Sequence, residues 1–129
     1  MRQSLILEDS QGIPKPVSKA ALLGLFRTLK DNIRVVLLNA CFSKSQAEAI
    51  TENIDCAIGM RTAIGDKAAI TFAAAFYRAI GFGRSVQTAF DLGINALQSE
   101  NIPEEATPVL LVRKGVNASQ LVLVNPRQA

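Results

Sequence analysis

A cysteine follows closely on a strand-length apolar run in this chain of 129 residues. Residues 33–38 are almost entirely apolar, and Asn39 and Ala40 lead from them to Cys41. In an open parallel sheet, reactive side chains gather beyond the carboxyl ends of the strands, where backbone amides that open the next helix can favour a thiolate and hold an oxyanion. Cys41 is therefore the candidate nucleophile. The alternative is a buried cysteine that acts only as a small apolar side chain.

The chain contains no histidine, which is the usual general base for a cysteine nucleophile. The residues around Cys41 thus predict half of an active site. A Cys-x5-Arg phosphate-binding loop is excluded, because Ala47 stands where the arginine would have to be. The second cysteine, Cys56, lies inside a predicted buried strand and is interpreted as structural.

Two apolar runs predict the strands that would position Cys41. Residues 33–38 and 54–60 lack polar alternation, which is typical of strands buried on both faces of a parallel sheet. Between them, Ser43 with Gln46, or Ser45 with Glu48, fits a capping box for a helix that runs to about Asn53.

Further helices and strands are predicted on either side. A long helix begins at Gly65-Asp66, has Ala69, Phe72, Phe76 and Ile80 inward, and is closed by Gly81 and Gly83. Ser85 caps another helix through Leu97. The remaining predicted elements are a hairpin over residues 4–17, a helix capped by Ser18, a polar loop over 99–108, and strands at 109–113 and 121–124 around a turn at 114–117. Strands that alternate with helices predict an α/β fold with a largely parallel sheet.

Composition narrows the class of protein. A hydrophobic content of 49% and a mean hydropathy of +0.22 predict one globular domain over residues 1–129. We expect no nucleic-acid binding, because the charge of +3 is scattered and only 5% of the residues are aromatic. No apolar stretch approaches the length of a membrane span, and we expect neither a membrane span nor a signal peptide. Two cysteines without spaced partners suit a reducing cytoplasm, so we expect a cytoplasmic protein without membrane contact. The two cysteines lack the spacing of a disulfide framework or of a Cys-type metal site, so we expect neither, and we expect no cofactor.

Several short motifs keep a fixed order along the chain. They are Val36–Ser43 (VLLNACFS), Ile58–Met60, Ile64–Asp66, Ala73–Tyr77, Gly83–Val86 and Ala89-Phe90. Their order resembles that of CHAT domains, which are caspase-like cysteine peptidases related to caspases and separase. Residues 5–17 resemble the hairpin between the two catalytic residues of that family.

The resemblance implies a three-layer caspase-like fold with Cys41 as the nucleophile. It also implies a histidine base in a His-Gly segment upstream of the hairpin, and this sequence holds no such segment. The chain is therefore similar to the C-terminal, cysteine-bearing portion of the family domain, with the first strands and the histidine-bearing segment missing.

The resemblance further implies that Arg61 and Asp66 belong to the wall of the substrate pocket. An acid in that region selects a basic side chain in separase-like members, so Asp66 is a candidate specificity residue. The alternatives are an N-cap aspartate and an ordinary surface arginine.

The function expected first is that of a CHAT-type peptidase portion that supplies Cys41 for hydrolysis of a protein or peptide, and that is inactive alone. The alternatives are a non-enzymatic protein–protein interaction module on a degenerate caspase-like scaffold and a redox-sensing thiol protein. A homo-oligomer is expected, because the caspase-like sheet runs 2-1-3-4-5-6 and the strand over 33–38 would lack its neighbour, the third strand. The simplest assembly is a two-fold dimer through this edge or through the strand at 109–113.

Overall fold

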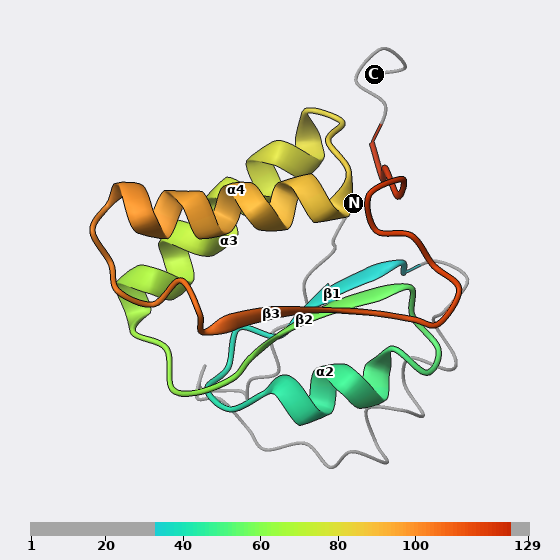
Figure 1. Cartoon of the computed structure of the whole chain (residues 1–129), viewed down its shortest axis with the longest axis horizontal. Coiled ribbons are helices and arrows are strands. Elements are labelled where there is room, and N and C mark those ends of the chain that lie inside the picture. Colours follow the sequence, from blue (N-terminus) through green and yellow to red (C-terminus); the bar gives the residue numbers. More distant parts are fainter. Residues whose placement is uncertain (1–32, 125–129) are drawn as a thin grey trace, which may run out of the picture. The chain divides into compact units, whose positions relative to one another are not determined.

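The computed structural model describes residues 33–124. They form two compact units, one made of residues 33–63 and 109–116 and the other of residues 64–108 and 117–124 (Figure 1). The hairpin expected over 4–17 and the helix expected from Ser18 lie outside the described residues. The single domain expected over residues 1–129 stays a prediction.

The first unit is built on a small sheet with strand order β1-β2-β3. β1 (Val35–Leu37) and β2 (Cys56–Met60) are parallel, with Val36 opposite Ala57. The residue after β3 (Pro108–Val112), Arg113, donates its N–H to the carbonyl of Asp55 just before β2 at 2.8 Å, so β3 runs against β2. The α/β class is confirmed. The expected parallel pairing is confirmed for β1 and β2 alone. Two helices, rather than one, connect β2 to β3. The second helix brings the chain back to the end of the sheet where β2 finishes, so β3 starts there and runs in the opposite direction.

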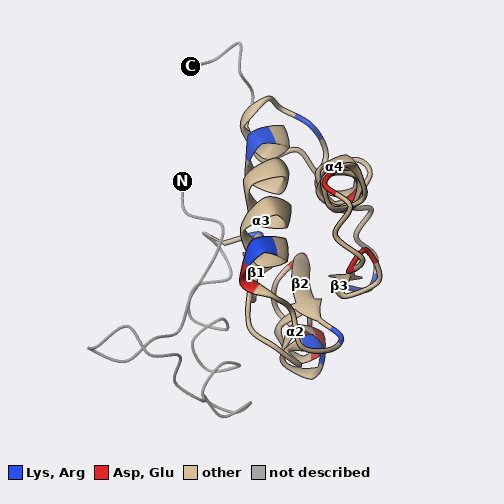
Figure 2. Ribbon diagram, turned by 90° about the vertical axis from the view of Figure 1, so that its left-hand side faces the viewer, with Lys and Arg blue, Asp and Glu red and all other residues tan. Residues whose placement is uncertain are grey.

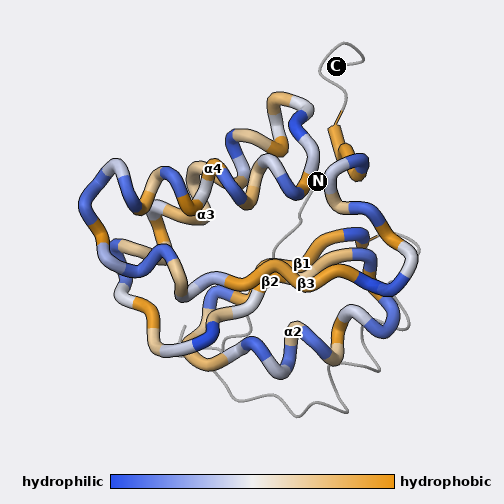
Figure 3. Tube along the Cα trace, in the orientation of Figure 1, coloured by the Kyte–Doolittle hydropathy of each residue, from blue (hydrophilic) through white to orange (hydrophobic). Residues whose placement is uncertain are grey.

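β1 and β2 are buried along their whole length, as their unbroken apolar runs predicted. Helix α2 (Lys44–Ile50) covers one face, and the strands are strongly hydrophobic (Figure 3). The cluster on this face consists of Val36, Leu38, Ala47, Ile50, Ile54 and Ala57.

Helix α2 ends at Ile50, which is earlier than the predicted end at Asn53. The Thr51 hydroxyl donates to the carbonyl of Glu48 at 2.7 Å, and the amides of Glu52 and Asn53 bond to carbonyls three residues back. The backbone thus tightens into turns before β2 begins.

The second unit is a pair of packed helices, α3 (Asp66–Gly81) and α4 (Val86–Ser99). Phe72 and Phe76 are fully buried, and the Phe72 ring meets Phe90 edge to face with centroids 5.7 Å apart. The predicted inward stripe of α3 is confirmed at Phe72, Phe76 and Ile80, whereas Ala68 is buried in place of Ala69. The middle of α3 carries no charge (Figure 2).

Both predicted helix boundaries around the 82–85 turn are confirmed. Gly83 has φ 84°, and its N–H and that of Arg84 bond to the carbonyls of Ile80 and Ala79, which closes α3 in a Schellman motif. Ser85 then caps α4, since its hydroxyl accepts from the Thr88 N–H at 3.1 Å.

The strand predicted at 121–124 is wrong. Val122 forms a single antiparallel bridge with Ser85, and the carbonyls of Leu121 and Ala118 accept from the amides of Val86 and Gln87. These amides open α4 and have no partner within the helix, so the segment is held there as a helix cap rather than in a sheet. No helix in residues 33–124 is both long and apolar enough to cross a membrane.

Candidate functional site

The two cysteines lie in opposite environments. Cys41 is exposed on the connection between β1 and α2, whereas Cys56 is buried as the first residue of β2. Burial raises the pKa of the Cys56 thiol to about 11, and the nearby Asp55 carboxylate adds to this effect. Cys56 is therefore protonated at neutral pH and sealed from solvent, which agrees with its interpretation as structural.

The Cys41 connection is fastened by the buried side chain of Ser43. Its hydroxyl donates to the carbonyl of Leu38 at 3.1 Å and accepts from the amide of Met60 at 2.9 Å. One oxygen thus joins the chain just past the end of β1 to the end of β2. The capping box predicted for Ser43 is wrong, because this hydroxyl makes no bond to the start of α2, and Ser45 lies inside the helix.

Helix α2 approaches β2 closely at Gly59. A Cβ at this position would come within 2.8 Å of the Ser43 carbonyl and 2.9 Å of the Ala47 Cβ, distances shorter than real Cβ contacts allow. Glycine therefore permits the start of α2 to lie directly on the strand. Between the Ser43 bonds and this contact, both ends of the turn that carries Cys41 are fixed.

The residue after the cysteine has an uncommon backbone conformation. Phe42 has φ 57°, in the left-handed region that non-glycine residues seldom occupy, and its ring is 67% exposed. Its N–H donates to the carbonyl of Thr62 at 3.2 Å. The amide that directly follows Cys41 is thus already used within the chain, in a bond to the loop that follows β2.

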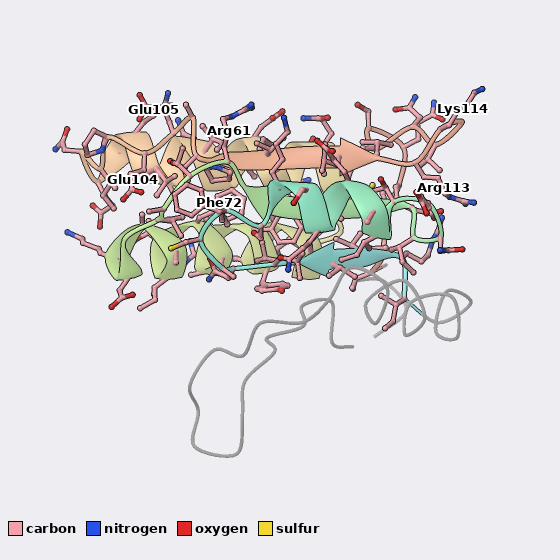
Figure 4. All side chains as sticks on the ribbon, turned by 90° about the horizontal axis from the view of Figure 1, so that it is seen from below. Arg61, Phe72, Glu104, Glu105, Arg113 and Lys114 are labelled. Carbon is pink, nitrogen blue, oxygen red and sulfur yellow. The ribbon has the colours of Figure 1, made fainter. Side chains whose placement is uncertain are left out.

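That same bond brings Arg61 toward the cysteine loop. Arg61 is the first residue after β2 and is exposed, and its neighbour Thr62 holds the Phe42 amide (Figure 4). Within the first unit, the backbone turn at Cys41-Phe42 and the loop at Arg61-Thr62 therefore lie side by side, at the carboxyl ends of the two parallel strands.

Asp66 belongs to the second unit and is the exposed first residue of α3. Its alternative role as the N-cap is wrong, because Gly65 occupies the cap. The Gly65 N–H lies 3.3 Å from each carboxylate oxygen of Glu104. Asp66 therefore does not cap α3 but lies in its first turn, where the helix dipole favours a negative charge.

An ion-pair cluster of one carboxylate and two guanidinium groups lies at the opposite end of the sheet and was not predicted from the sequence. Asp55, just before β2 begins, accepts from Arg113 at 2.7 Å and from Arg34 at 3.0 Å. Figure 4 labels Arg113. Burial acts to raise the pKa of Asp55, but the hydrogen bonds from Arg113 and Arg34 outweigh it and hold the pKa below its usual value. The cluster joins β3 to the sheet and lies away from Cys41, so we assign it to stability.

Residues suited to a metal ion do not gather within residues 33–124, where no group of three or more His, Cys, Asp or Glu side chains is found. The arrangement around Cys41 is thus one of an exposed thiol on a fixed turn, beside the loop that begins at Arg61.

Comparison with known proteins gives one informative match. No family model matches the chain. A protein named "Probable protease" from Gillisia limnaea is 33% identical over 105 residues, which cover 78% of this chain and 19% of that protein. The chain therefore spans about a fifth of the length of this curated relative, and it is similar to one part of a larger protein that carries a protease name.

Proposed function

We propose that this chain is the cysteine-bearing portion of a caspase-like, CHAT-type cysteine peptidase. The observation that carries the proposal is the exposed Cys41 on a fixed turn at the carboxyl end of β1, in a chain similar to part of a protein named as a protease. The order β1-β2-β3 supports it, because it agrees with the order of the last three strands in the caspase-like sheet.

In this proposal the Cys41 sulfur attacks the carbonyl carbon of a peptide bond. A C–S bond forms, the C–N bond breaks, and the amine leaves with a proton, after which water hydrolyses the thioester. A general base must take the proton from the thiol and pass it to the amine. This chain contains no histidine, so in the proposal another segment or another chain supplies the base. We therefore expect the isolated chain to hydrolyse no reporter peptide.

The test uses electrophilic peptides, which need no general acid for a leaving amine. Peptidyl acyloxymethyl ketones should alkylate Cys41, identified by mass spectrometry, faster than they alkylate a short unstructured peptide with the sequence Ala-Cys-Phe. Cys41→Ala should abolish labelling, and Cys56→Ala should leave the labelling rate unchanged.

Substrate preference is tested in the same assay. The resemblance implies that an electrophile with arginine before the reactive carbon reacts faster than one with leucine or aspartate, and that Asp66→Asn removes this difference. Alkylation of Cys41 at the rate of the unstructured peptide, with no preference among the three electrophiles, would contradict the peptidase proposal and favour the interaction module. Peptide hydrolysis that is lost in Cys41→Ala would instead show that another group completes the site.

A further inference from the structure

A groove in the second unit combines positive charge with exposed apolar side chains. It lies between the C-terminal half of α3 and the middle of α4 and has a volume of about 350 Å³. Its polar lining is Arg78, Arg84 and Asn95, and its large apolar side chains are Phe82 and Leu92.

The positive charge of this groove is not neutralised within the described residues. Neither Arg78 nor Arg84 forms an ion pair there, and the residues 33–124 that line the groove include no aspartate or glutamate. Two guanidinium groups without a carboxylate partner favour an anion, since arginine pairs with carboxylates through two parallel hydrogen bonds.

The exposure of the large apolar side chains in the groove is not explained by the way in which α3 ends. Phe82 is 67% exposed and Leu92 is 43% exposed. The last carbonyls of α3 are already satisfied by the amides of Phe82, Gly83 and Arg84, so the Phe82 ring plays no part in ending the helix. An aromatic and an aliphatic side chain beside unpaired arginines are typical of a surface that is covered by a ligand.

We propose that this groove binds an acidic peptide segment of a partner protein. One bulky apolar side chain of the segment lies against Phe82 and Leu92, and flanking carboxylates pair with Arg78 and Arg84. The Asn95 side chain offers both a donor and an acceptor to the backbone of the peptide. A volume of about 350 Å³ suits one or two side chains, which matches a short linear segment rather than a folded surface.

The experiment measures fluorescence anisotropy of a labelled peptide in which glutamates flank a phenylalanine. The acidic peptide should bind the full chain saturably and at least tenfold more tightly than the same peptide with glutamines in place of the glutamates. Raising the salt concentration should weaken the binding, because exposed charges are screened.

Matched variants separate this groove from a general effect of net charge. The double variant Arg78→Gln, Arg84→Gln should weaken binding at least tenfold, and Phe82→Ser should weaken it severalfold. The double variant Lys67→Gln, Lys114→Gln removes the same charge from exposed positions outside the groove and should leave binding unchanged.

Three results would overturn the proposal: no saturable binding, equal binding of the glutamine peptide, or equal weakening by both double variants. Circular dichroism of each variant establishes that the helices are retained, so that a loss of binding reports on the groove. None of these measurements depends on Cys41, so they stand apart from the test of the peptidase proposal.

Discussion

At the scale of single residues, the Ser43 hydroxyl has the largest structural role around the candidate nucleophile. Buried polar groups require partners, and this oxygen satisfies two buried backbone groups, one just past the end of β1 and one at the end of β2. It therefore substitutes for a ladder bond at the point where the chain leaves the sheet to form the Cys41 turn.

We expect Ser43→Ala to lower the free energy of unfolding by about 1–3 kcal/mol, because the Met60 amide and the Leu38 carbonyl lose a buried partner. Urea denaturation measures this change. Ser45→Ala, an exposed position in the same helix, serves as the control and should change stability by less than about 0.5 kcal/mol. Equal effects of the two substitutions would show that the hydroxyl contributes no more than an ordinary surface serine.

The sequence analysis located Cys41 and Cys56 correctly relative to their strands, because an apolar run of strand length is a local signal. It missed the contacts that hold the Cys41 turn and the start of α3. The Ser43 hydroxyl accepts from the Met60 amide 17 residues away, and the Glu104 carboxylate accepts from the Gly65 amide 39 residues away. Capping-box spacing predicted a partner for Ser43 at the start of the helix, but its hydroxyl bonds to the backbone of Leu38 and Met60 instead. The catalytic role of Cys41 and the pocket roles of Arg61 and Asp66 stay predictions.

At the scale of elements, the contact between α3 and α4 depends on one glycine. A Cβ on Gly93 would come within 2.6 Å of the Phe72 ring, which is fully buried and stacked near Phe76. Because the Phe72 ring is fully buried and lies directly against this position, Gly93 sets how closely the two helices pack.

We expect Gly93→Ala to destabilise the protein by about 1–3 kcal/mol through overpacking, which outweighs the gain of about 1 kcal/mol in helix propensity. Gly81→Ala is the matched control, since its Cβ would meet nothing within 4 Å. That substitution should be neutral or stabilising. The midpoint of thermal unfolding is measured for both variants. A higher midpoint for Gly93→Ala than for the parent would mean that α3 and α4 leave room for a methyl group at this position.

The cluster at Asp55 predicts a dependence of stability on acid pH. Because its folded pKa lies below the unfolded value of about 3.9, the stabilisation is complete above that pH and is lost as the pH falls through the folded value. Asp55→Asn should therefore be less stable than the parent by about 1–2 kcal/mol at pH 7, since hydrogen bonds to a charged group are lost.

The difference between parent and Asp55→Asn should begin to shrink in urea titrations below about pH 4, where the aspartate of the unfolded chain becomes protonated, and should be lost as the pH falls through the lower pKa of the folded protein. Asp91→Asn, at an exposed position with a side-chain bond to Gln87, provides the comparison and should show no such trend. A stability gap for Asp55→Asn that stays constant from pH 7 to pH 2 would contradict the charge-based role.

The elements themselves were largely predictable, and their ends were not. Buried strands and the helix caps at Gly83 and Ser85 have local signals in apolar runs and in turn residues. The segment at 121–124 has the same apolar composition as a strand, yet its carbonyls serve the first amides of α4. The direction of β3 likewise depends on the number of helices between β2 and β3, and the apolar pattern of a single strand carries no information on that number.

At the scale of the whole molecule, the two edges of the described sheet differ. β1 is buried at every residue, whereas β3 is half-buried over most of its length and Val112 is 37% exposed. β3 also begins with Pro108, a residue that sheets tolerate at the first position of an edge strand. Of the two edges considered for a dimer, these features favour β3.

We expect the protein to form a two-fold dimer through β3, with a mass in solution of twice 13.8 kDa by light scattering. Val112→Lys should shift the mass toward 13.8 kDa, because a charge on an edge strand opposes pairing with a second copy. Val122→Lys, which is 46% exposed and lies outside the sheet, should leave the dimer intact. A monomeric parent protein at high concentration would contradict this assembly.

The close contact at Gly59 has a consequence for sequence variation among related chains. A Cβ at position 59 would collide with the Ala47 Cβ and the Ser43 carbonyl, so the residues at positions 59 and 47 cannot vary independently in related chains. Relatives with glycine at 59 should accept alanine at 47. A relative with a larger residue at 59 must shift α2 outward, together with the turn that carries the cysteine. Under the proposed function, glycine at position 59 should therefore occur together with Cys41 in related chains, and chains that have lost this glycine should also have lost the cysteine.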